Sequence, residues 1–318
     1  MEYFVLNNGV KIPAIGFGTG IAKGFSIHPT YAIKRIIKEI AKNLFIPGFK
    51  ENNKYPVYKD IKKDMTLKRV SLDAYREGYR LFDTARAYMY SEEYLGEALF
   101  SHGKIDRDSV FLISKISNTT QRNHTISEDF ELTLKNLKTD YLDLLLMHWP
   151  QPMEYLNTWK VMEKLYKDKK VRAIGVCNCH IHHLEEIKKV AEIPVMVNEI
   201  ECHPMFQQKP DRMYCKENGI QVIAYTPTGK MNSTILNNEA IVGIKKKYNL
   251  DSVSQIILRW HYQLGNVSIP NTTNLVHMRE NFNIWNFELT DSEMKEISKM
   301  DIGYKIWPDS NNCDYNKL

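Results

Sequence analysis

Short apolar runs of four to seven residues recur along most of the chain, each followed by a stretch with helical spacing. Every run ends on a polar or ionisable residue, and these ends are Asp83, Lys115, His148, Asn178, Glu199, Tyr225 and Asn271. Near-continuous apolar runs are typical of parallel strands that are buried on both faces. Since a (β/α)8 barrel builds its active site from the C-terminal ends of its strands, these seven residues are predicted to surround one pocket.

A further strand and a hairpin are expected near the N-terminus. The run AIGFGTG at residues 14–20 reads as the first buried strand, and residues 65–79 read as the helix that leads to the second. Upstream, Asn8-Gly9 lies between two short apolar runs and is a preferred pair for a type I′ turn. Strands that alternate with helices favour parallel βαβ units, and eight such strands close a barrel. We therefore predict an α/β fold in which residues 1–318 form a single (β/α)8 TIM barrel domain with an N-terminal β-hairpin.

Residues 21–66 interrupt this alternation and form a long insertion after the first barrel strand. Within them, Tyr31 to Leu44 places apolar residues at helical spacing, interleaved with lysine and arginine. This segment is interpreted either as a helix packed on the barrel with a solvated basic face, or as a surface for a partner or an anionic membrane. Because the insertion leaves the C-terminal end of a strand, we expect it on the active-site face, as a lid or pocket wall.

Composition and charge indicate a soluble cytoplasmic protein. The chain is 43% hydrophobic and 25% charged, and its net charge of +5 comes from scattered lysines, which does not indicate nucleic-acid binding. The N-terminus lacks the pattern of a signal peptide, and no apolar stretch is long enough for a membrane span. The five cysteines lack a disulfide spacing and suit reduced thiols. A monomer or weak oligomer is expected.

Four residues at or near consecutive strand ends form a candidate catalytic group: Asp83, Tyr88, Lys115 and His148. A buried lysine favours the phenolate of a neighbouring tyrosine, and a carboxylate keeps that lysine charged. We therefore expect the pKa of Tyr88 to be lowered from about 10 towards neutral pH, where a tyrosine can act as a general acid. His148 has the donor needed to polarise a carbonyl oxygen. Singly, these residues could cap, snorkel or hydrogen-bond in the core; their shared position at successive strand ends favours catalysis.

The stretch GYRLFDTARAYMYSEEYLGEAL at residues 78–99 resembles the signature of the aldo-keto reductase family, including a tyrosine five residues after the aspartate of Asp-Thr-Ala. Other segments that are similar to the family are LNNGVKIPAIGFGTG (6–20), LLLMHWP (144–150), IGVCN (174–178), VNEIECHP (197–204), AYTPTG (224–229), SQIILRW (254–260) and IPNTTNLVHMREN (269–281). The resemblance covers the chain except the insertion and the last few residues.

The resemblance implies NAD(P)H-dependent reduction of an aldehyde or ketone, with hydride from C4 of the nicotinamide and a proton from Tyr88. It implies that Tyr225 stacks on the nicotinamide and that Asn178 hydrogen-bonds its carboxamide. The remaining residues implied at the cofactor are Thr19, Glu199, Thr226, Asn271, Thr272, His277, Glu280 and Asn281. Trp149 and Trp307 are expected to line the substrate pocket. The implied cofactor is NADP(H), and the implied partner is a small-molecule carbonyl substrate.

One departure from the family pattern lies beside the candidate acid. The family has a glutamate eight residues after the aspartate, whereas Glu92 stands nine after Asp83, so one residue is inserted near Met89-Tyr90. Tyr90 is therefore a rival acid. Tyr88 keeps the family's spacing from the strand end, and the following turn can absorb the insertion.

Other departures lie in the implied cofactor site. Glu199 stands where the family has glutamine, and an ionised glutamate offers only acceptors to the carboxamide. Its charge would favour the oxidised, cationic ring, unless the side chain is protonated or turned away. Asn271 and His277 replace the lysine and arginine that hold the 2′-phosphate of NADPH, so a weaker preference for NADPH is expected and NAD(H) is possible.

Two alternatives remain for the function: a catalytically weak, dinucleotide-binding regulatory barrel, and a barrel isomerase or aldolase. The second requires a glycine-rich phosphate loop, of which TPTGK at residues 226–230 is a poor version. The cluster CNCHIHH at residues 177–183 has the composition of a metal site but lacks metal-ligand spacing, so no metal is expected.

Overall fold

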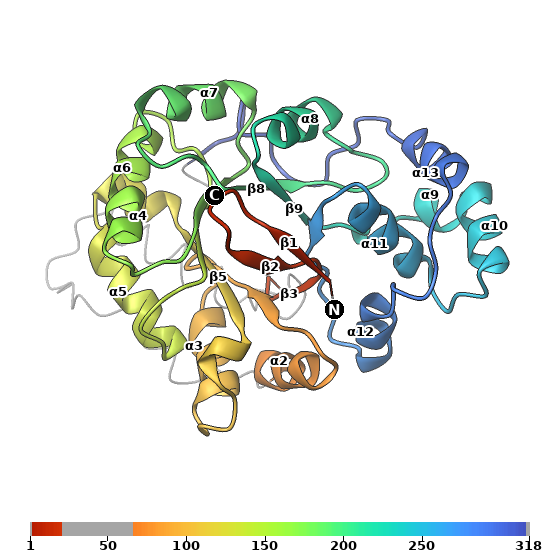
Figure 1. Ribbon diagram of the computed structural model, residues 1–318, viewed down its shortest axis with the longest axis horizontal. Coiled ribbons are helices and arrows are strands. Elements are labelled where there is room, and N and C mark those ends of the chain that lie inside the picture. Colours follow the sequence, from red (N-terminus) through yellow and green to blue (C-terminus); the bar gives the residue numbers. More distant parts are fainter. Residues whose placement is uncertain (1, 21–65, 316–318) are drawn as a thin grey trace, which may run out of the picture. The chain divides into compact units, whose positions relative to one another are not determined.

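The computed structural model describes residues 2–20 and 66–315 (Figure 1). The expected insertion, including its basic helical segment, lies outside the described residues apart from Thr66. Met1–Gly20 and Leu67–Leu318 group into one compact unit. In the described part of the chain, no helix combines the length and apolarity needed to cross a bilayer.

The expected N-terminal hairpin is present, but its turn differs from the prediction. Strands β1 (Tyr3–Val5) and β2 (Lys11–Pro13) pair antiparallel. Among the turn residues only Gly9 has a positive φ, of 85°, whereas a type I′ turn requires positive φ at both central residues. The amide of Gly9 donates to the carbonyl of Leu6 at 2.9 Å, so the chain turns one residue earlier than the Asn8-Gly9 pair suggests.

Eight parallel strands form the barrel that the sequence predicts, in chain order around the sheet. They are β3 (Gly16–Gly18), β4 (Leu81–Asp83), β5 (Phe111–Ile116), β6 (Leu144–Met147), β7 (Ile174–Cys177), β8 (Val197–Glu201), β9 (Gln221–Tyr225) and β10 (Val267–Ser268). A parallel bridge between Ile15 and Ser268 joins the last strand to the first, and the Ser268 amide donates to Ala14 at 3.1 Å. Neighbouring strands are thus paired all around the barrel, and their C-terminal ends lie at one end of it.

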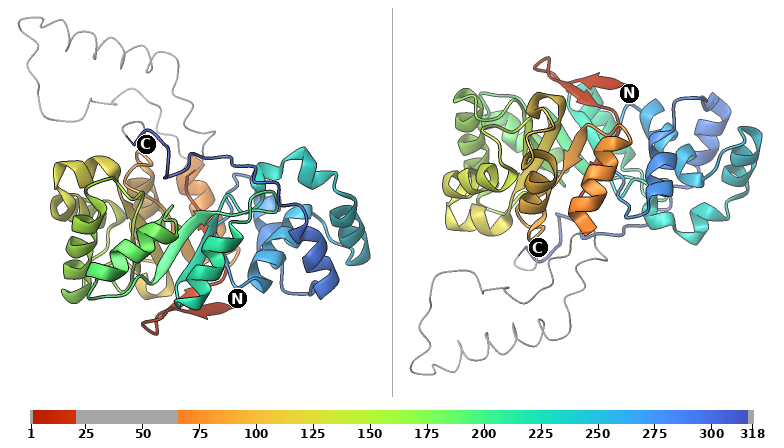
Figure 2. Two further views of the ribbon diagram at one scale, coloured as in Figure 1. Left: turned by 90° about the horizontal axis from the view of Figure 1, so that it is seen from above. Right: turned by 90° about the horizontal axis from the view of Figure 1, so that it is seen from below.

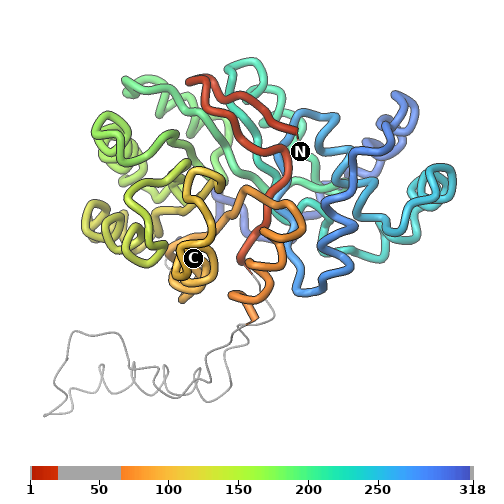
Figure 3. The backbone as a smooth tube through the Cα atoms, turned by 60° about the horizontal axis from the view of Figure 1, so that its bottom comes forward, coloured from red at the N-terminus to blue at the C-terminus, as the bar shows by residue number. Residues whose placement is uncertain are grey.

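Helices surround the barrel (Figure 3). Amphipathic helices bury their apolar faces by packing against the outer side of the strands. The helices are α2 (Thr66–Arg76), α3 (Ser91–Phe100), α4 (Asn118–Asn123), α5 (Ile126–Leu137), α6 (Tyr155–Lys167), α7 (Ile181–Val190), α8 (Lys209–Glu217), α9 (Ser233–Leu236), α10 (Glu239–Lys247), α11 (Val253–Gln263), α12 (Leu275–Phe282) and α13 (Asp291–Ser298), with 3-10 turns η1 (Arg107–Ser109) and η2 (Gly229–Met231). Side-chain caps fix several starts; Thr290 and Glu293, for example, form a capping box at α13. Trp159 and Trp260 are fully buried, on α6 and α11.

The polar residues that end the apolar runs in the sequence are not all at the ends of strands in the structure. Asp83 and Tyr225 are the last residues of β4 and β9, and His148 and Asn178 directly follow β6 and β7. Glu199, however, lies inside β8, which continues to Glu201. Because side chains alternate along a strand, Glu199 and Glu201 share one face, and both are buried. A glutamate pair therefore occupies the strand where the sequence suggests a single terminal residue.

The two ends of the barrel are covered by different parts of the chain (Figure 2). The hairpin lies across the N-terminal end, where Asn7 Nδ2 donates to the carbonyl of Val195, just before β8, at 2.9 Å. The C-terminal tail crosses the opposite end, which carries the C-terminal ends of the strands. The predicted site residues are therefore found beside the tail rather than the hairpin.

Candidate active site

Lys115 is the centre of a buried ionic cluster. Its ammonium donates to Asp83 Oδ2 at 2.5 Å and to the carbonyl of Thr84 at 3.0 Å, and it lies 3.4 Å from Glu199 Oε1. Strands β4, β5 and β8 each supply one charged side chain, and none is more than 2% exposed. Lys115 is paired as a buried charge requires, but with two carboxylates instead of one.

Tyr88 and His148 lie against this cluster. The Lys115 ammonium is 5.2 Å from the centre of the Tyr88 ring, and the rings of Tyr88 and His148 meet edge to face at 5.6 Å. A Cβ added to Gly20 would stand 3.3 Å from Tyr88 Cε2, so the small residue after β3 leaves room for the phenol ring. The structure thus brings together all four residues of the candidate catalytic group.

The inserted residue is absorbed in the turn after Tyr88. Met89 adopts a left-handed φ of 54°, and the amide of Ser91 donates to the carbonyl of Tyr88 at 3.1 Å as α3 begins. Tyr90 is the N-cap residue of α3, and its ring packs against Tyr94 at 6.0 Å. It is Tyr88, therefore, that contacts Lys115 and His148.

The electrostatics of the group differ from the sequence-based expectation at one residue. Burial raises the pKa of Tyr88, and the ammonium of Lys115 offsets only part of that rise. The carboxylates of Asp83 and Glu199 raise it further, so the expected lowering of the Tyr88 pKa is wrong. The expectation left out the cost of burying a phenolate, which is the largest cause of the rise. Tyr88 is consequently a protonated phenol at neutral pH.

His148 and Lys115 hold fixed protonation states near pH 7. Burial and the charge of Lys115 lower the pKa of His148 to about 3, so its imidazole is neutral. Burial would lower the pKa of Lys115, but the carboxylates of Asp83 and Glu199 outweigh it, so that pKa is raised well above its usual value. A charged lysine, a neutral histidine and a protonated tyrosine therefore face the same space.

Asn178 and Tyr225 extend the site towards β7 and β9. The Tyr225 hydroxyl donates to Asn178 Oδ1 at 2.7 Å, and Asn178 Nδ2 donates to the carbonyl of His148 at 3.0 Å. The backbone amide of Asn178 donates to the carbonyl of Glu199 at 2.9 Å. Asn178 has a left-handed φ of 58°, an uncommon conformation that often marks functional turns. These contacts tie the residues expected at the nicotinamide to the catalytic group.

Three residues expected at the cofactor carry a buried side-chain oxygen that receives no hydrogen bond from the described residues. These atoms are Thr19 Oγ1, Glu199 Oε2 and Asn281 Oδ1. Buried polar atoms are nearly always paired, since an unpaired one costs about 1–3 kcal/mol. A ligand that hydrogen-bonds to them would remove this cost. The residues present thus fit a dinucleotide that extends from the barrel centre to α12.

The region expected at the 2′-phosphate contains little fixed charge from the predicted residues. Asn271 Nδ2 donates to the carbonyl of Gly20 at 2.9 Å, and the amide of Asn274 donates to Thr272 Oγ1 at 3.1 Å. His277 is exposed and Glu280 half-buried on α12. A cation that sequence reasoning missed lies here: Arg69 of α2 places Nη2 3.4 Å from the carbonyl of Thr273. No local pattern signals it, because Arg69 and Thr273 are 204 residues apart.

The C-terminal tail contacts Thr226, one of the residues expected at the cofactor. Trp307 Nε1 donates to Thr226 Oγ1 at 2.9 Å, and the ammonium of Lys230 lies 4.2 Å from the Trp307 ring centre. Trp307 therefore rests on a predicted cofactor residue, with 38% of its surface exposed. Trp149, the other residue expected at the substrate, is buried directly after His148.

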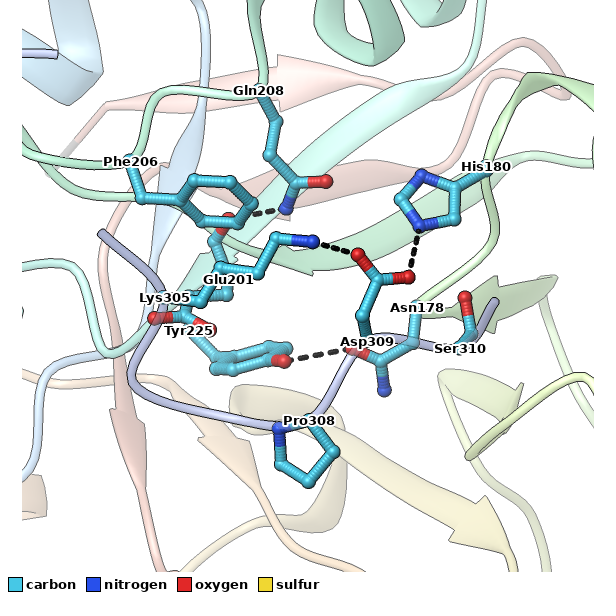
Figure 4. Close-up of a pocket in the computed structure, with 10 residues that line it drawn as sticks. All are labelled: Asn178, His180, Glu201, Phe206, Gln208, Tyr225, Lys305, Pro308, Asp309 and Ser310. Carbon is cyan, nitrogen blue, oxygen red and sulfur yellow. Dashed lines mark hydrogen bonds and ion pairs between the residues drawn. The ribbon is translucent and has the colours of Figure 1, made fainter. Parts of the chain in front are cut away.

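A pocket separates the tail from the strand ends (Figure 4). It is lined by Asn178, His180, Glu201, Phe206, Gln208, Tyr225, Lys305, Pro308, Asp309 and Ser310. Glu201 is a second residue that sequence reasoning missed: its carboxylate accepts the backbone amides of Ile306 and Trp307 at 2.7 and 3.1 Å. Glu201 stands two residues after Glu199, so in a strand both side chains point to the same face, and this spacing could have identified it. Among the described residues, no group of three or more His, Cys, Asp or Glu side chains is arranged to hold a metal ion.

An eight-stranded parallel barrel with an ionic cluster at the C-terminal ends of its strands defines a barrel enzyme. The sequence profile of the Aldo/keto reductase family matches residues 56–302. A 9,11-endoperoxide prostaglandin H2 reductase of Trypanosoma cruzi (strain CL Brener) is 41% identical over 241 residues, covering 75% of this chain and 84% of its own. A glyoxal reductase of Bacillus subtilis (strain 168) is 43% identical over 235 residues, covering 74% and 83%.

Solved structures agree with the sequence matches. The crystal structure of a Bombyx mori aldo-keto reductase in complex with NADP superposes with a TM-score of 0.79 at 25% identity, covering 98% of this chain and 96% of that one. The chain therefore belongs to the aldo/keto reductase family. It is an NAD(P)H-dependent oxidoreductase that reduces carbonyl groups.

Proposed function

We propose that this reductase protonates its carbonyl substrate with Tyr88, and that Asp83, Lys115 and His148 set the position and charge of that tyrosine. The observation that carries the proposal is the contact of the Tyr88 ring with both the Lys115 ammonium and the His148 ring. When bound, a reduced nicotinamide supplies the hydride. The role of the protein is to hold the carbonyl oxygen and to deliver the proton.

Each residue has a distinct part in that proton delivery. His148 is neutral, so one ring nitrogen can donate to the carbonyl oxygen without transferring its proton. Tyr88 keeps its proton until negative charge develops on the oxygen, and it then donates that proton to the oxygen. Lys115 stabilises the resulting phenolate by charge, and Asp83 holds the ammonium at 2.5 Å.

The substrate class we propose is a small reactive aldehyde, such as a dicarbonyl. This rests on the 43% identity to a protein named glyoxal reductase and the 36% identity to one named methylglyoxal reductase. For the cofactor we propose NADPH with a weaker preference over NADH than a lysine and arginine pair would give, because Asn271 and His277 offer a 2′-phosphate neither the ammonium nor the bidentate guanidinium of such a pair. All five cysteines are unpaired, which supports a reaction in the reducing cytoplasm.

The proposal is tested by comparing Tyr88→Phe with Tyr90→Phe. Loss of a general acid lowers turnover by about 10²–10⁴-fold, so Tyr88→Phe should reduce NADPH oxidation with glyoxal or methylglyoxal by that factor. Dinucleotide binding, followed by quenching of protein fluorescence, should change little. Tyr90→Phe is the matched control, because it removes the neighbouring phenol hydroxyl and should retain near-normal turnover.

The outcomes separate the alternatives. If Tyr90→Phe is the inactive variant, the acid is Tyr90 and the assignment of Tyr88 is wrong. If the unmodified protein binds NADPH but oxidises it with none of a panel of aldehydes, ketones and sugars, the regulatory barrel is the better description.

A further inference from the structure

Glu199 places a second carboxylate on the ammonium of Lys115. Glu199 Oε1 lies 3.4 Å from Lys115 Nζ, and Asp83 Oδ2 lies 2.5 Å from the same nitrogen. The side chains of the three residues are almost completely buried. If both carboxyl groups were ionised, the cluster would hold one uncompensated negative charge away from water.

An uncompensated buried charge is expensive, and one proton on the carboxylate pair would remove it. Glu199 Oε2 has no hydrogen-bond partner among the described residues, so no donor stabilises a negative charge on that oxygen. Burial and the negative charge of Asp83 raise the pKa of Glu199 to about 8 against the opposing effect of Lys115. Burial raises the pKa of Asp83 as well. Two carboxylates that share a site in this way ionise in sequence rather than together.

We propose that Asp83 and Glu199 share one proton beside Lys115, and that this proton is released when the nicotinamide ring bound in the site is in its oxidised, cationic form. The inference rests on the proposed function, since it requires the ring to lie beside Asn178 and Tyr225. The proton passes to water or buffer, and no other bond is made or broken. Glu199 is thus a residue that sets the preference of the site for one redox form of its cofactor.

The geometry couples the ring to the proton through β8. Asn178 and Tyr225, the residues expected at the ring, bond to each other, and Asn178 bonds to the backbone of Glu199. A positive ring in this buried space favours the ionised pair, whereas the neutral, reduced ring has no such effect. By linkage, the affinity for the oxidised dinucleotide should rise with pH while the pair is protonated, by up to about tenfold per pH unit.

Other titratable groups also face Glu199 and must be separated from it. Tyr88 follows β4, Cys177 pairs in register with Glu199 on β7, and Tyr225 ends β9. Burial, the largest cause in each case, raises the pKa of the Cys177 thiol and of both phenols, so these groups keep their protons at neutral pH. Lys115 keeps its positive charge at neutral pH, because the nearby carboxylates outweigh burial and raise its pKa well above the usual value. The carboxyl pair is therefore the group able to lose a proton near pH 7.5.

The experiment is calorimetric titration with NADP+ and with NADPH at pH 7.5 in two buffers of different ionisation enthalpy. The dependence of the binding heat on the buffer gives the number of protons released. NADP+ should release between about half a proton and one proton more than NADPH does, and Glu199→Gln should abolish this difference. Taking the difference between the two dinucleotides cancels proton changes at their phosphates. Cys177→Ser is the matched control and should keep the difference.

Each result has a definite reading. If Glu199→Gln retains the excess proton release, or if the unmodified protein shows none while it binds both dinucleotides and reduces an aldehyde, the shared proton is disproved and the proposed function stands. If Cys177→Ser abolishes it, the thiol is the source and the inference is wrong. If neither dinucleotide binds, both the inference and the proposed function fail.

Discussion

At the scale of single residues, the region proposed for the 2′-phosphate contains a cation from a distant part of the chain, Arg69 of α2. Neither Asn271 nor His277, the residues expected there, is a lysine or an arginine. Arg69 enters the same region from α2, and Asp73 lies 3.2 Å from its Nη1. Since 57% of the Arg69 side chain is exposed, solvent screens the charge, and we expect a modest effect on a bound phosphate.

Replacing Arg69 with alanine should therefore weaken NADPH binding by about three- to tenfold, or about 1 kcal/mol, without changing NADH binding. The measurement is the dissociation constant of each dinucleotide from fluorescence quenching. Arg76→Ala is the matched control, because Arg76 lies on the same helix, is 70% exposed and also pairs with Asp73. An equal loss of affinity for both dinucleotides, or the same loss in Arg76→Ala, would show that Arg69 does not contact the phosphate.

At the scale of elements, the apolar pattern predicts the strands well. Strands that are buried on both faces need apolar side chains along their length, so burial produces the pattern. Lys115 and Asp83 can be assigned to a common site from their strands alone, since parallel strands bring their C-terminal ends together. The turn after β1 and the length of β8 depend on backbone geometry and pairing that the apolar pattern does not encode. The contacts of Arg69 and of the tail arise only when distant segments meet, so no local signal precedes them.

Glu201 and Met205 each accept two backbone amides of the tail, and the Met205 carbonyl takes those of Ile302 and Tyr304 at 3.2 and 3.0 Å. The buried carboxylate of Glu201 accepts the amides of Ile306 and Trp307 and faces His203 Nε2 at 3.0 Å. Further along, His180 bridges Asp211 and Asp309 at 3.2 and 2.9 Å. Several polar contacts thus hold the tail, and most of its residues from 301 to 308 are exposed, which is typical of segments that open locally.

Glu201→Gln should loosen the tail without unfolding the barrel. A glutamine has one acceptor oxygen where the carboxylate has two, so one of the tail amides loses a charge-assisted hydrogen bond worth about 1.5–3 kcal/mol. Amide hydrogen exchange in a peptide covering residues 302–310 should accelerate by roughly tenfold or more, while β5 and β6 stay protected. Glu217→Gln, at the exposed end of α8, is the control. Unchanged exchange at the tail would show that other contacts hold it.

At the scale of the whole molecule, buried ionisable groups limit stability on both sides of neutrality. Burial lowers the pKa of His261 to about 3, as burial and Lys115 do for His148. A group with a depressed pKa in the folded state contributes stability that is present above its unfolded pKa, near 6.5, and lost as pH falls towards 3. Glu199 acts in the opposite sense, because burial raises its pKa to about 8. Its contribution to the free energy of unfolding is fully present below its unfolded pKa of about 4.5 and is lost as pH rises through 8.

His261 allows the acid side to be tested away from the active site. The imidazole is fully buried, with Nε2 3.1 Å from the carbonyl of Pro227 and Nδ1 3.3 Å from Asn266 Nδ2. Below pH 6.5 the unfolded chain binds a proton that the folded chain excludes, so His261 alone lowers the free energy of unfolding by up to about 1.4 kcal/mol per pH unit. In urea melts from pH 7 to 4, His261→Gln should start less stable than the unmodified protein, and the gap should narrow as pH falls. His102→Gln, at an exposed position, should run parallel to the unmodified protein. A constant gap for His261→Gln would mean that this imidazole is protonated in the fold and that the acid sensitivity has another source.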